Sequence, residues 1–423
     1  MEKEILFSHL EEHREEIFAW GKLFFQTAEL GFQEYSTAAQ ITALLDQWQI
    51  PYEKNIAMTG IRATLGREGY HIAFVSDMDA LPRQSGIGNV HSCGHSIQTV
   101  LALSLLKVLK ETKLAEETGC RISFFFTPAE EFIDFAFRDK LIAQGKLRYR
   151  SGKQNMIAQG CFDDVDCVLS AHANGEQDTL FDIQSTLTGF LAKKAVFLGK
   201  SAHSGAAPHL GRNALHGAIL CQNAFAFLKE HFPPEAGLRL HPVLTEQSGT
   251  VNIIPDRVVL ETYLRANDTD TLMKAAAEAD NCVRHCAAAL GLECEIETAP
   301  GYLPLRQSSA LNAIVRENIL LHCKKEDLLE NVVSGASGDI GDLSFLLPTI
   351  QMGFSGIEGQ FHHDAFAIRD QENCYLRTAK VLLGVCFDLM TEPKLRLYPE
   401  KFSEKKAQWQ KIMAQTPISS PIE

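Results

Sequence analysis

Hydrophobic and polar positions along the chain fall into three patterns. As far as Trp48, apolar and charged residues recur at the spacing of α-helices. Short, continuous apolar runs come next, at residues 70–82, 120–131 and 164–175. Such runs are typical of strands buried on both faces of a sheet. Because a helical pattern over residues 99–112 separates the first two runs, we predict a largely parallel α/β sheet.

A third pattern occupies the middle of the chain. Its predicted elements are a strand, a helix, two strands, a helix and a last strand, at residues 192–199, 213–230, 248–255, 257–266, 270–291 and 292–299. This β-α-β-β-α-β order is that of the split βαβ, or ferredoxin-like, motif. A chain of 423 residues also exceeds one ordinary core, which favours two domains. We therefore predict a second domain over residues 185–298, inserted into a first domain made of residues 1–184 and 299–423.

Helix and strand patterns resume after the insertion. We predict a helix over residues 311–325, a strand over residues 348–355 and a helix over residues 374–390. From about Glu392 the chain is charged and contains several prolines. This last stretch is predicted to be a peripheral tail.

Acidic or imidazole side chains follow each of the three apolar runs of the first domain. Asp77 and Asp79 end the first run, Glu130 and Glu131 end the second, and His172 ends the third. The carboxyl ends of the strands are where function gathers in parallel α/β sheets. Adjacent carboxylates repel each other, so a positive group is expected near Glu130 and Glu131. Taken singly, Glu130 and Glu131 also fit a solvated loop, and a lone histidine such as His172 is more often satisfied by hydrogen bonds than by a metal ion.

The stretch VHSCGHSIQT has three interpretations: a metal site, a cysteine nucleophile or a buried turn. Cys93 and His95 are of residue types that can bind a metal ion, at C-x-H spacing, and Gly94 permits a sharp turn; alone, such residues in a loop are mostly structural. A nucleophilic Cys93 with His95 as its base has poor geometry when both lie on one short turn. QFHHDAF adds His362 and His363 near the C-terminus. Cys, His and Glu side chains from four segments favour zinc, manganese or a related divalent ion.

Two further stretches with histidine lie in the inserted domain. His203, in GKSAHSGAAPHLGRNAL, follows a predicted strand, and its small neighbours leave room around the imidazole. A surface histidine in a tight turn is the alternative interpretation. In NCVRHC, Cys282 and Cys286 lie four residues apart on a predicted helix, beside His285. A half-buried amphipathic helix explains this stretch better than a metal site does.

Composition and charge exclude some classes of partner. The net charge is −13 and the chain has no block rich in Lys or Arg, unlike a typical nucleic-acid-binding protein. The first residues, MEKEILFSHLEEHREEIFAW, lack the apolar core of a signal peptide, and no apolar run reaches the roughly 20 residues of a membrane helix. Eleven scattered cysteines are typical of reduced thiols. We expect a cytoplasmic protein that binds neither nucleic acid nor membranes.

Eight stretches, taken in order, resemble the motifs of peptidase family M20. They are TAELGFQEYSTAAQI, SDMDALP, HSCGHS, TPAEE, SAHANG, SAHSGAAPHLGRNAL, NIIPD and HHDAF. The resemblance covers nearly the whole chain. Within the family, the chain is most similar to the amidohydrolase branch of aminoacylases, auxin-conjugate hydrolases and aminobenzoyl-glutamate hydrolases. The resemblance implies an α/β catalytic domain with an inserted lid domain through which two subunits pair.

The resemblance also implies roles for named residues. It implies two divalent ions per subunit, zinc or manganese first and cobalt or nickel as alternatives, held by Cys93, His95, Glu131, His172 and His362. Glu130 matches the general base, and Asp79 matches an aspartate that orients the site. His203 matches a histidine that reaches the substrate carbonyl and stabilises the oxyanion, often in the partner's site. Asn252 matches a substrate-binding position.

Three positions differ from the pattern of other family members. Asp77 lies where other branches carry a histidine ligand, so here it is expected to support the site without coordinating. Ser96 and Gln98 stand where this branch commonly has Asp and His, which bears on the orientation of the ligands.

The expected activity is metal-dependent hydrolysis of the amide bond in N-acyl amino acids or amino-acid conjugates. A small-molecule amide and a second copy of the chain are the expected partners. One alternative is a metallo-dipeptidase of the same family. Another is a non-catalytic relative that only binds substrate, suggested by Ser96 and Gln98.

Overall fold

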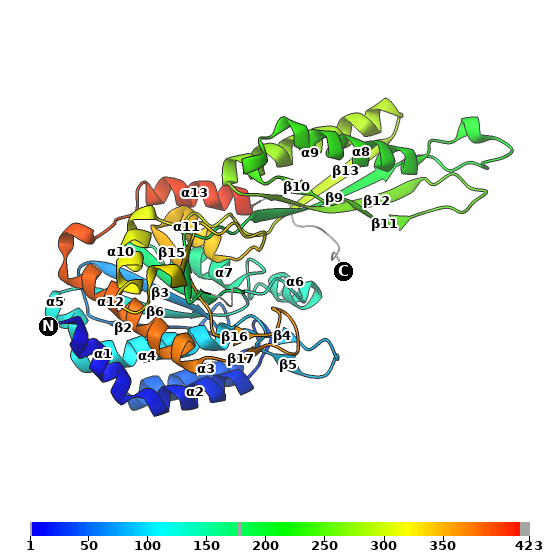
Figure 1. Ribbon diagram of the computed structural model, residues 1–423. Helices are drawn as coiled ribbons and strands as arrows, with labels where there is room; N and C mark the ends of the chain where they lie inside the picture. The colour runs from blue at the N-terminus through cyan, green and yellow to red at the C-terminus, as the bar shows by residue number, and fades with distance from the viewer. Residues whose placement is uncertain (1, 176–178, 415–423) are drawn as a thin grey trace. The chain divides into compact units, whose positions relative to one another are not determined.

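The computed structural model describes residues 2–175 and 179–414, and the chain divides into two compact units (Figure 1). The first unit comprises Met1–Thr186, Arg306–Ser334 and Leu346–Phe402. The second comprises Leu187–Leu305, Gly335–Phe345 and Ser403–Glu423. Each unit contains a β-sheet of its own.

An eight-stranded sheet forms the centre of the first unit, in the order β1-β2-β6-β3-β7-β15-β8-β14. The four middle strands, β6, β3, β7 and β15, run parallel to one another, and the edge strand β14 is parallel to β8. The other three pairs, β1 with β2, β2 with β6 and β8 with β15, are antiparallel. The prediction of a largely parallel sheet is therefore confirmed. The strands are Tyr52–Ile56 (β1), Gly60–Leu65 (β2), His71–Asp77 (β3), Arg121–Thr127 (β6), Cys167–Ala173 (β7), Phe181–Ile183 (β8), Leu328–Glu330 (β14) and Thr349–Phe354 (β15).

The three apolar runs form strands because both faces of the middle of the sheet are covered. On β6, Phe124 and Phe126 join the main core with Phe74 of β3. Phe125 points to the other face, where its ring centroid lies 4.4 Å from that of Phe162. Continuous apolar runs are the expected sequence pattern of strands buried on two sides.

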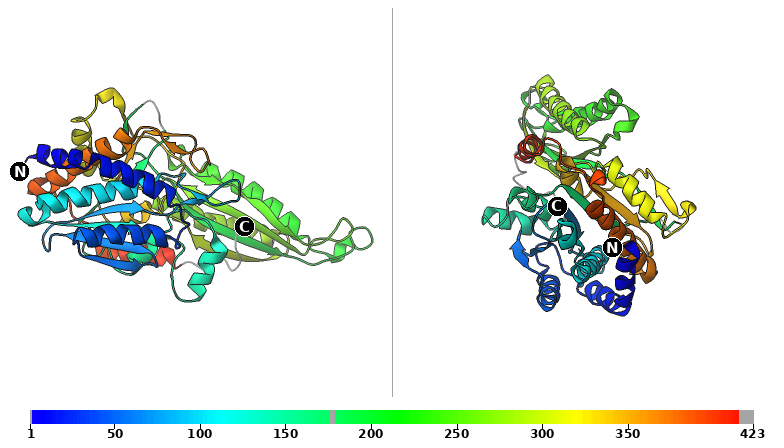
Figure 2. Two further views of the ribbon diagram at one scale, coloured as in Figure 1. Left: turned by 90° about the horizontal axis from the view of Figure 1, so that it is seen from below. Right: turned by 90° about the vertical axis from the view of Figure 1, so that its left-hand side faces the viewer.

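Helices pack on the sheet of the first unit (Figure 2). Helix α4 (His95–Thr112) lies against β3, β6 and β7, and helices α1, α2 and α12 pack on α4. None of the helices within residues 2–175 and 179–414 is both long and apolar enough to cross a membrane. The other helices of this unit are Lys3–Glu12 (α1), Arg14–Gln26 (α2), Tyr35–Gln47 (α3), Leu114–Thr118 (α5), Phe135–Ala143 (α6), Gly152–Ala158 (α7), Ser309–Ile319 (α10) and Thr378–Thr391 (α12).

The second unit has the predicted ferredoxin-like arrangement. Its sheet has the order β10-β12-β9-β13, with β11 also paired to β12, and all of these pairs are antiparallel. Helices α8 and α9 lie side by side on this sheet (Figures 1 and 2). The elements are Gly189–Leu198 (β9), Ala214–Leu228 (α8), Arg239–Leu240 (β10), Val243–Gln247 (β11), Arg257–Ala266 (β12), Thr269–Ala289 (α9) and Glu293–Pro300 (β13).

Two predictions are wrong, the strand over residues 248–255 and the peripheral tail. Residues 248–255 do not form a strand; the strand lies earlier, at β11, and a turn follows it. Gly249 in this turn has φ +85° and the side chain of Val251 is fully exposed, so its apolar character gives no burial. The tail is not simply peripheral, because α13 (Phe402–Met413) buries Trp409 completely. The indole N–H of Trp409 donates to Asp342 at 2.6 Å.

The buried histidine that begins β3 makes the stability of the first unit sensitive to acid. Burial lowers the pKa of His71 to about 4, and its two ring nitrogens contact Ser123 Oγ at 2.8 Å and the Asp164 carbonyl at 2.9 Å. Because the folded pKa lies below the usual value of about 6.5, the unfolded chain binds the proton more readily. The stabilisation is complete above pH 6.5 and is lost as the pH falls toward 4, by about 3 kcal/mol.

We therefore expect His71→Gln to flatten the fall in stability between pH 7 and pH 4.5. Urea unfolding of the chelated protein at several pH values would measure this. His285→Gln, on an exposed position of α9, is the matched control and should leave the pH dependence unchanged. Equal slopes for the wild type and His71→Gln would contradict the assignment.

Candidate metal centre

The polar side chains predicted at the strand ends lie at one edge of the first unit's sheet. Asp79 follows β3, Glu130 and Glu131 follow β6, and His172 lies on β7. Because β6, β3 and β7 are parallel neighbours, their carboxyl ends meet at the same edge. The loop between β16 (Ile357–Glu358) and β17 (Ala367–Ile368) adds His362.

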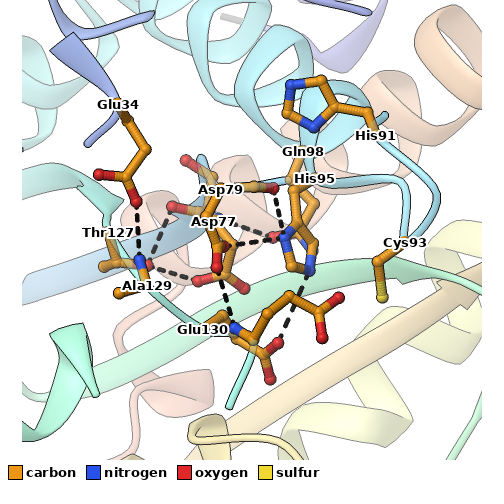
Figure 3. Close-up of polar contacts among 12 residues, drawn as sticks. Glu34, Asp77, Asp79, His91, Cys93, His95, Gln98, Thr127, Ala129 and Glu130 are labelled. Carbon is orange, nitrogen blue, oxygen red and sulfur yellow. Dashed lines mark hydrogen bonds and ion pairs between the residues drawn. The ribbon is translucent and has the colours of Figure 1, made fainter. Parts of the chain in front are cut away.

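A sharp turn brings Cys93 and His95 to this edge. Gly94 has φ +85°, a left-handed conformation, and α4 begins at the next residue. Nδ1 of His95 lies 3.0 Å from both the carbonyl and the carboxylate of Asp79. Both are acceptors, so Nδ1 carries a proton, and Nε2 is the ring atom that can bind a metal ion (Figure 3).

The other two histidines lie beside this turn. Nδ1 of His172 donates to the Ala173 carbonyl at 2.7 Å, which leaves Nε2 as the acceptor, 3.6 Å from Cys93 Sγ. Nε2 of His362 lies 3.4 Å from a carboxylate oxygen of Glu131. Nδ1 of the neighbouring His363 accepts the N–H of Ala365 at 3.1 Å.

Asp79 bonds both to His95 and to the segment after β6 that carries Glu130 and Glu131. One of its oxygens contacts His95, and the other accepts the backbone N–H of Glu131 at 2.9 Å. Oε2 of Glu130 lies 3.8 Å from Nε2 of His95. Burial by itself would raise the pKa of Asp79, but the bond to His95 holds it below its ordinary value. Asp79 therefore holds the imidazole of His95 and the backbone of Glu131 at once.

These side chains form three overlapping groups of potential metal ligands. Within each group the ligand atoms lie within 4.8 Å of one another, and the groups are Cys93, His95 and His172; Cys93, Glu131 and His362; and His95, Glu130 and Glu131. In the described part of the chain, His95 Nε2 and Glu131 Oε1 are buried and make no hydrogen bond. Buried polar atoms normally have partners. Divalent ions therefore fit both the donor set and these two atoms.

The pKa values of the acidic side chains in the centre also favour a bound cation. Burial, reinforced by Glu131, raises the pKa of Cys93 above its ordinary range. Burial and the charge of Asp79 raise the pKa of Glu131, although His95 opposes this. A nearby cation would favour the ionised forms of both side chains. A nucleophilic cysteine needs a lowered pKa, so these surroundings weigh against the interpretation of Cys93 as a nucleophile.

Asp77 is paired with a residue that the sequence analysis missed. It forms a buried ion pair with Lys153 of α7 and accepts a hydrogen bond from Thr127. Gln98 accepts the backbone N–H of Asp77 at 2.9 Å. Asp77 is outside the three ligand groups. Lys153 stands in the polar stretch RSGKQNM, which gave no signal of burial.

The remaining predicted site residues belong to the second unit. His203 is exposed, and its Nδ1 accepts the backbone N–H groups of Gly205 at 3.2 Å and Ala206 at 3.0 Å. The proton of the neutral ring is therefore on Nε2. The carbonyl of Asn252 accepts the N–H of Ser204 at 3.0 Å, which joins the two stretches.

Comparison with known proteins identifies the family. Residues 73–387 match the model of peptidase family M20/M25/M40. The chain belongs to this family. It is 26% identical over 412 residues to a Mus musculus Xaa-Arg dipeptidase, an alignment that covers 91% of this chain and 88% of the relative. It is also 26% identical over 362 residues to a Bacillus subtilis N-acetyl-L-cysteine deacetylase, with 81% of each chain covered.

Solved structures of M20 proteins share the fold. A Staphylococcus aureus protein described as a putative aminohydrolase superposes with a TM-score of 0.80 at 22% identity, over 92% of this chain and 100% of that one. A Bacillus subtilis protein described as a dinuclear metal-binding peptidase superposes with a TM-score of 0.70 at 18% identity, over 90% and 99%. A catalytic domain with a lid domain is the arrangement expected of such proteins.

Proposed function

We propose that the protein is a metal-dependent hydrolase that cleaves the amide bond of N-acyl amino acids or amino-acid conjugates. The observation that carries this proposal is the convergence of cysteine, histidine and carboxylate donors at one sheet edge, with Glu130 next to them. Membership of peptidase family M20 supports it. Relatives named as a deacetylase of N-acetyl-L-cysteine and as hydrolases of IAA-amino acids support the substrate class.

The proposed cofactors are two divalent ions, which Cys93, His95, Glu131, His172 and His362 would hold. Cys93, His95 and Glu131 each belong to two of the three ligand groups, so the donors are close enough together to serve two ions. The Bacillus subtilis structure described as dinuclear supports the number of ions. The mixed Cys, His and Glu donors suit zinc or manganese, and cobalt or nickel are alternatives.

When bound, divalent ions would polarise the carbonyl of the substrate and lower the pKa of a bound water, to near 7 in zinc enzymes. Glu130 accepts the proton of the attacking water and returns it to the leaving amine. Asp79 keeps His95 in the tautomer that ligation requires. His203, with its proton on Nε2, would donate to the oxygen that gains charge, and Asn252 would bind the substrate.

A metallo-dipeptidase is the second candidate. It is favoured by the relatives named Xaa-Arg dipeptidase, one of which aligns with 91% of this chain. A dipeptide is itself an N-acylated amino acid, so the two candidates share one mechanism and differ in the pocket that holds the acyl group.

Amine release from a panel of N-acyl amino acids and dipeptides tests the proposal. We expect zinc- or manganese-loaded protein to turn over part of the panel, and chelation to abolish this turnover. Restoring the metal should restore activity, and the preferred substrates separate the two candidates. Ligand binding without turnover in every loaded sample would support the non-catalytic alternative. Activity that persists in chelator would overturn the metal mechanism.

We further propose a cytoplasmic homodimer that pairs through the second unit. The structure describes all eleven cysteines as free thiols, in keeping with a reducing compartment. Exposed apolar side chains on α8, including Phe227 at 65% exposure, support a contact surface in that unit. Light scattering should give twice the chain mass. A fully active monomer would contradict both the dimer and a role for His203 in the partner's site.

A further inference from the structure

A buried carboxyl outside the ligand groups lies next to the turn that carries Glu130 and Glu131. Glu34, which precedes α3, is fully buried. One of its oxygens accepts the backbone N–H of Ala129 at 2.9 Å, and the other accepts the hydroxyl of Thr59. Figure 3 shows the carboxylate directed at the Ala129 nitrogen. The mechanism proposed above gives this residue no task.

Ala129 has a backbone conformation that needs support. Its φ is +53°, in the left-handed region that L-residues other than glycine seldom adopt. Such a conformation persists only where the surroundings hold it, and it is often found at functional sites. It falls one residue before Glu130, so the direction of that side chain depends on this turn. The N–H that Glu34 accepts belongs to the strained residue itself.

Two other buried side chains hold the same segment. Asp79 accepts the N–H of Glu131 at 2.9 Å, and the guanidinium of Arg138, 1% exposed, donates to the Glu131 carbonyl. Gly31 leaves room for this packing, because a Cβ there would lie 2.7 Å from Arg138 Nη2 and 2.8 Å from Ala129 Cα. The backbone of residues 129–131 is therefore fixed from three directions.

The surroundings of Glu34 suit a neutral hydrogen-bonding role. Burial, and after it the charge of Asp79, raises the pKa of Glu34 to about 8. A glutamine has the same size and keeps an acceptor oxygen, so it is a close mimic of this side chain. Because a buried polar group is costly unless it is bonded, the contacts with Ala129 and Thr59 account for its presence.

We propose that Glu34 is a positioning residue: it holds the left-handed turn at Ala129 and thereby sets the Glu130 carboxylate beside His95. The catalytic consequence rests on the proposed function, in which Glu130 is the base. The mechanical part does not, because the order of the turn is measurable without turnover.

The test compares Glu34→Ala with Glu34→Gln in the full-length, metal-loaded protein. We expect Glu34→Ala to lower kcat about 10- to 100-fold while KM changes less than about threefold, since small displacements of a reacting group cost rates of this order. Glu34→Gln keeps an acceptor for the Ala129 N–H and should stay within about threefold of the wild type. A role only in global folding would not produce this split or this rescue.

Hydrogen–deuterium exchange gives a readout that needs no substrate. In Glu34→Ala, peptides that cover residues 127–133 should exchange faster while the rest of the first unit is unchanged. Thr59→Val removes the other bond of Glu34 but keeps the one to Ala129. Glu29→Ala removes the acceptor for the N–H groups of Ser36 and Thr37 at the start of α3. Both controls should leave residues 127–133 protected.

Unchanged exchange at residues 127–133 in a folded Glu34→Ala protein would overturn the proposal. A loss in Glu34→Gln as large as that in Glu34→Ala would also overturn it. Should Glu34→Ala fail to fold, Glu34→Asp replaces it, because the shorter side chain withdraws the carboxyl from Ala129. A wild type without turnover on any substrate would defeat the proposed function, whereas the exchange data would still decide the role of Glu34.

Discussion

Replacing Glu130 by glutamine is expected to lower kcat by about 10²- to 10⁴-fold, the usual contribution of a general acid–base group. The amide keeps the size of the side chain but neither accepts a proton from water nor returns one to the leaving amine. The side chain has 13% exposure and lies 3.8 Å from Nε2 of His95, so its loss should disturb the fold little. Steady-state kinetics with the preferred substrate measures the effect, and metal content and thermal unfolding are recorded in parallel.

The neighbouring carboxylate supplies the contrast for this prediction. Glu131→Gln alters a proposed ligand, so it should lose bound metal as well as activity, whereas Glu130→Gln should retain the metal content of the wild type. Substitution at two adjacent positions thus separates proton transfer from metal binding. Wild-type activity in Glu130→Gln, or loss of its metal, would remove Glu130 from the role of base.

The fold was predictable where burial determines the pattern of apolar residues in the sequence. Strands β3, β6 and β7 are apolar along their length because helices and loops cover them on both sides. The stretch at residues 248–255 misled the prediction because its apolar residues lie in an exposed turn. Trp409, Ile412 and Met413 have the spacing of a buried helical face, so the sequence itself contains the pattern that predicts α13.

The candidate ligands were easier to predict than the residues that support them. Cysteine, histidine and paired carboxylates are conspicuous in a sequence, and each follows a recognisable strand or turn. Glu34 acts on Ala129, 95 residues away, and no local pattern encodes that contact. Lys153 belongs to a residue type that is seldom fully buried without a partner, so its sequence predicts a surface position. Supporting residues depend on long-range packing, which only the structure supplies.

The ion pair between Lys153 and Asp77 has the largest expected effect on stability. Both side chains are buried, at 1% and 7% exposure, and Thr127 also donates to the same oxygen of Asp77. Lys153→Met leaves the carboxylate buried without its partner. Breaking such a pair costs about 3–5 kcal/mol of unfolding free energy, because the remaining charge is neither paired nor solvated. Urea unfolding of the chelated protein, followed by tryptophan fluorescence, would measure the loss.

A double-mutant cycle shows whether the pair itself is responsible. Lys153→Met combined with Asp77→Asn removes both charges, so the double variant should recover much of the stability that Lys153→Met loses. Lys146→Met, at an exposed position before α7, is the matched control and should change the unfolding free energy by less than about 0.5 kcal/mol. Additive losses in the cycle would show that Lys153 stabilises the fold through contacts other than Asp77. Recovery would show instead that Lys153 stabilises the fold through its pairing with Asp77.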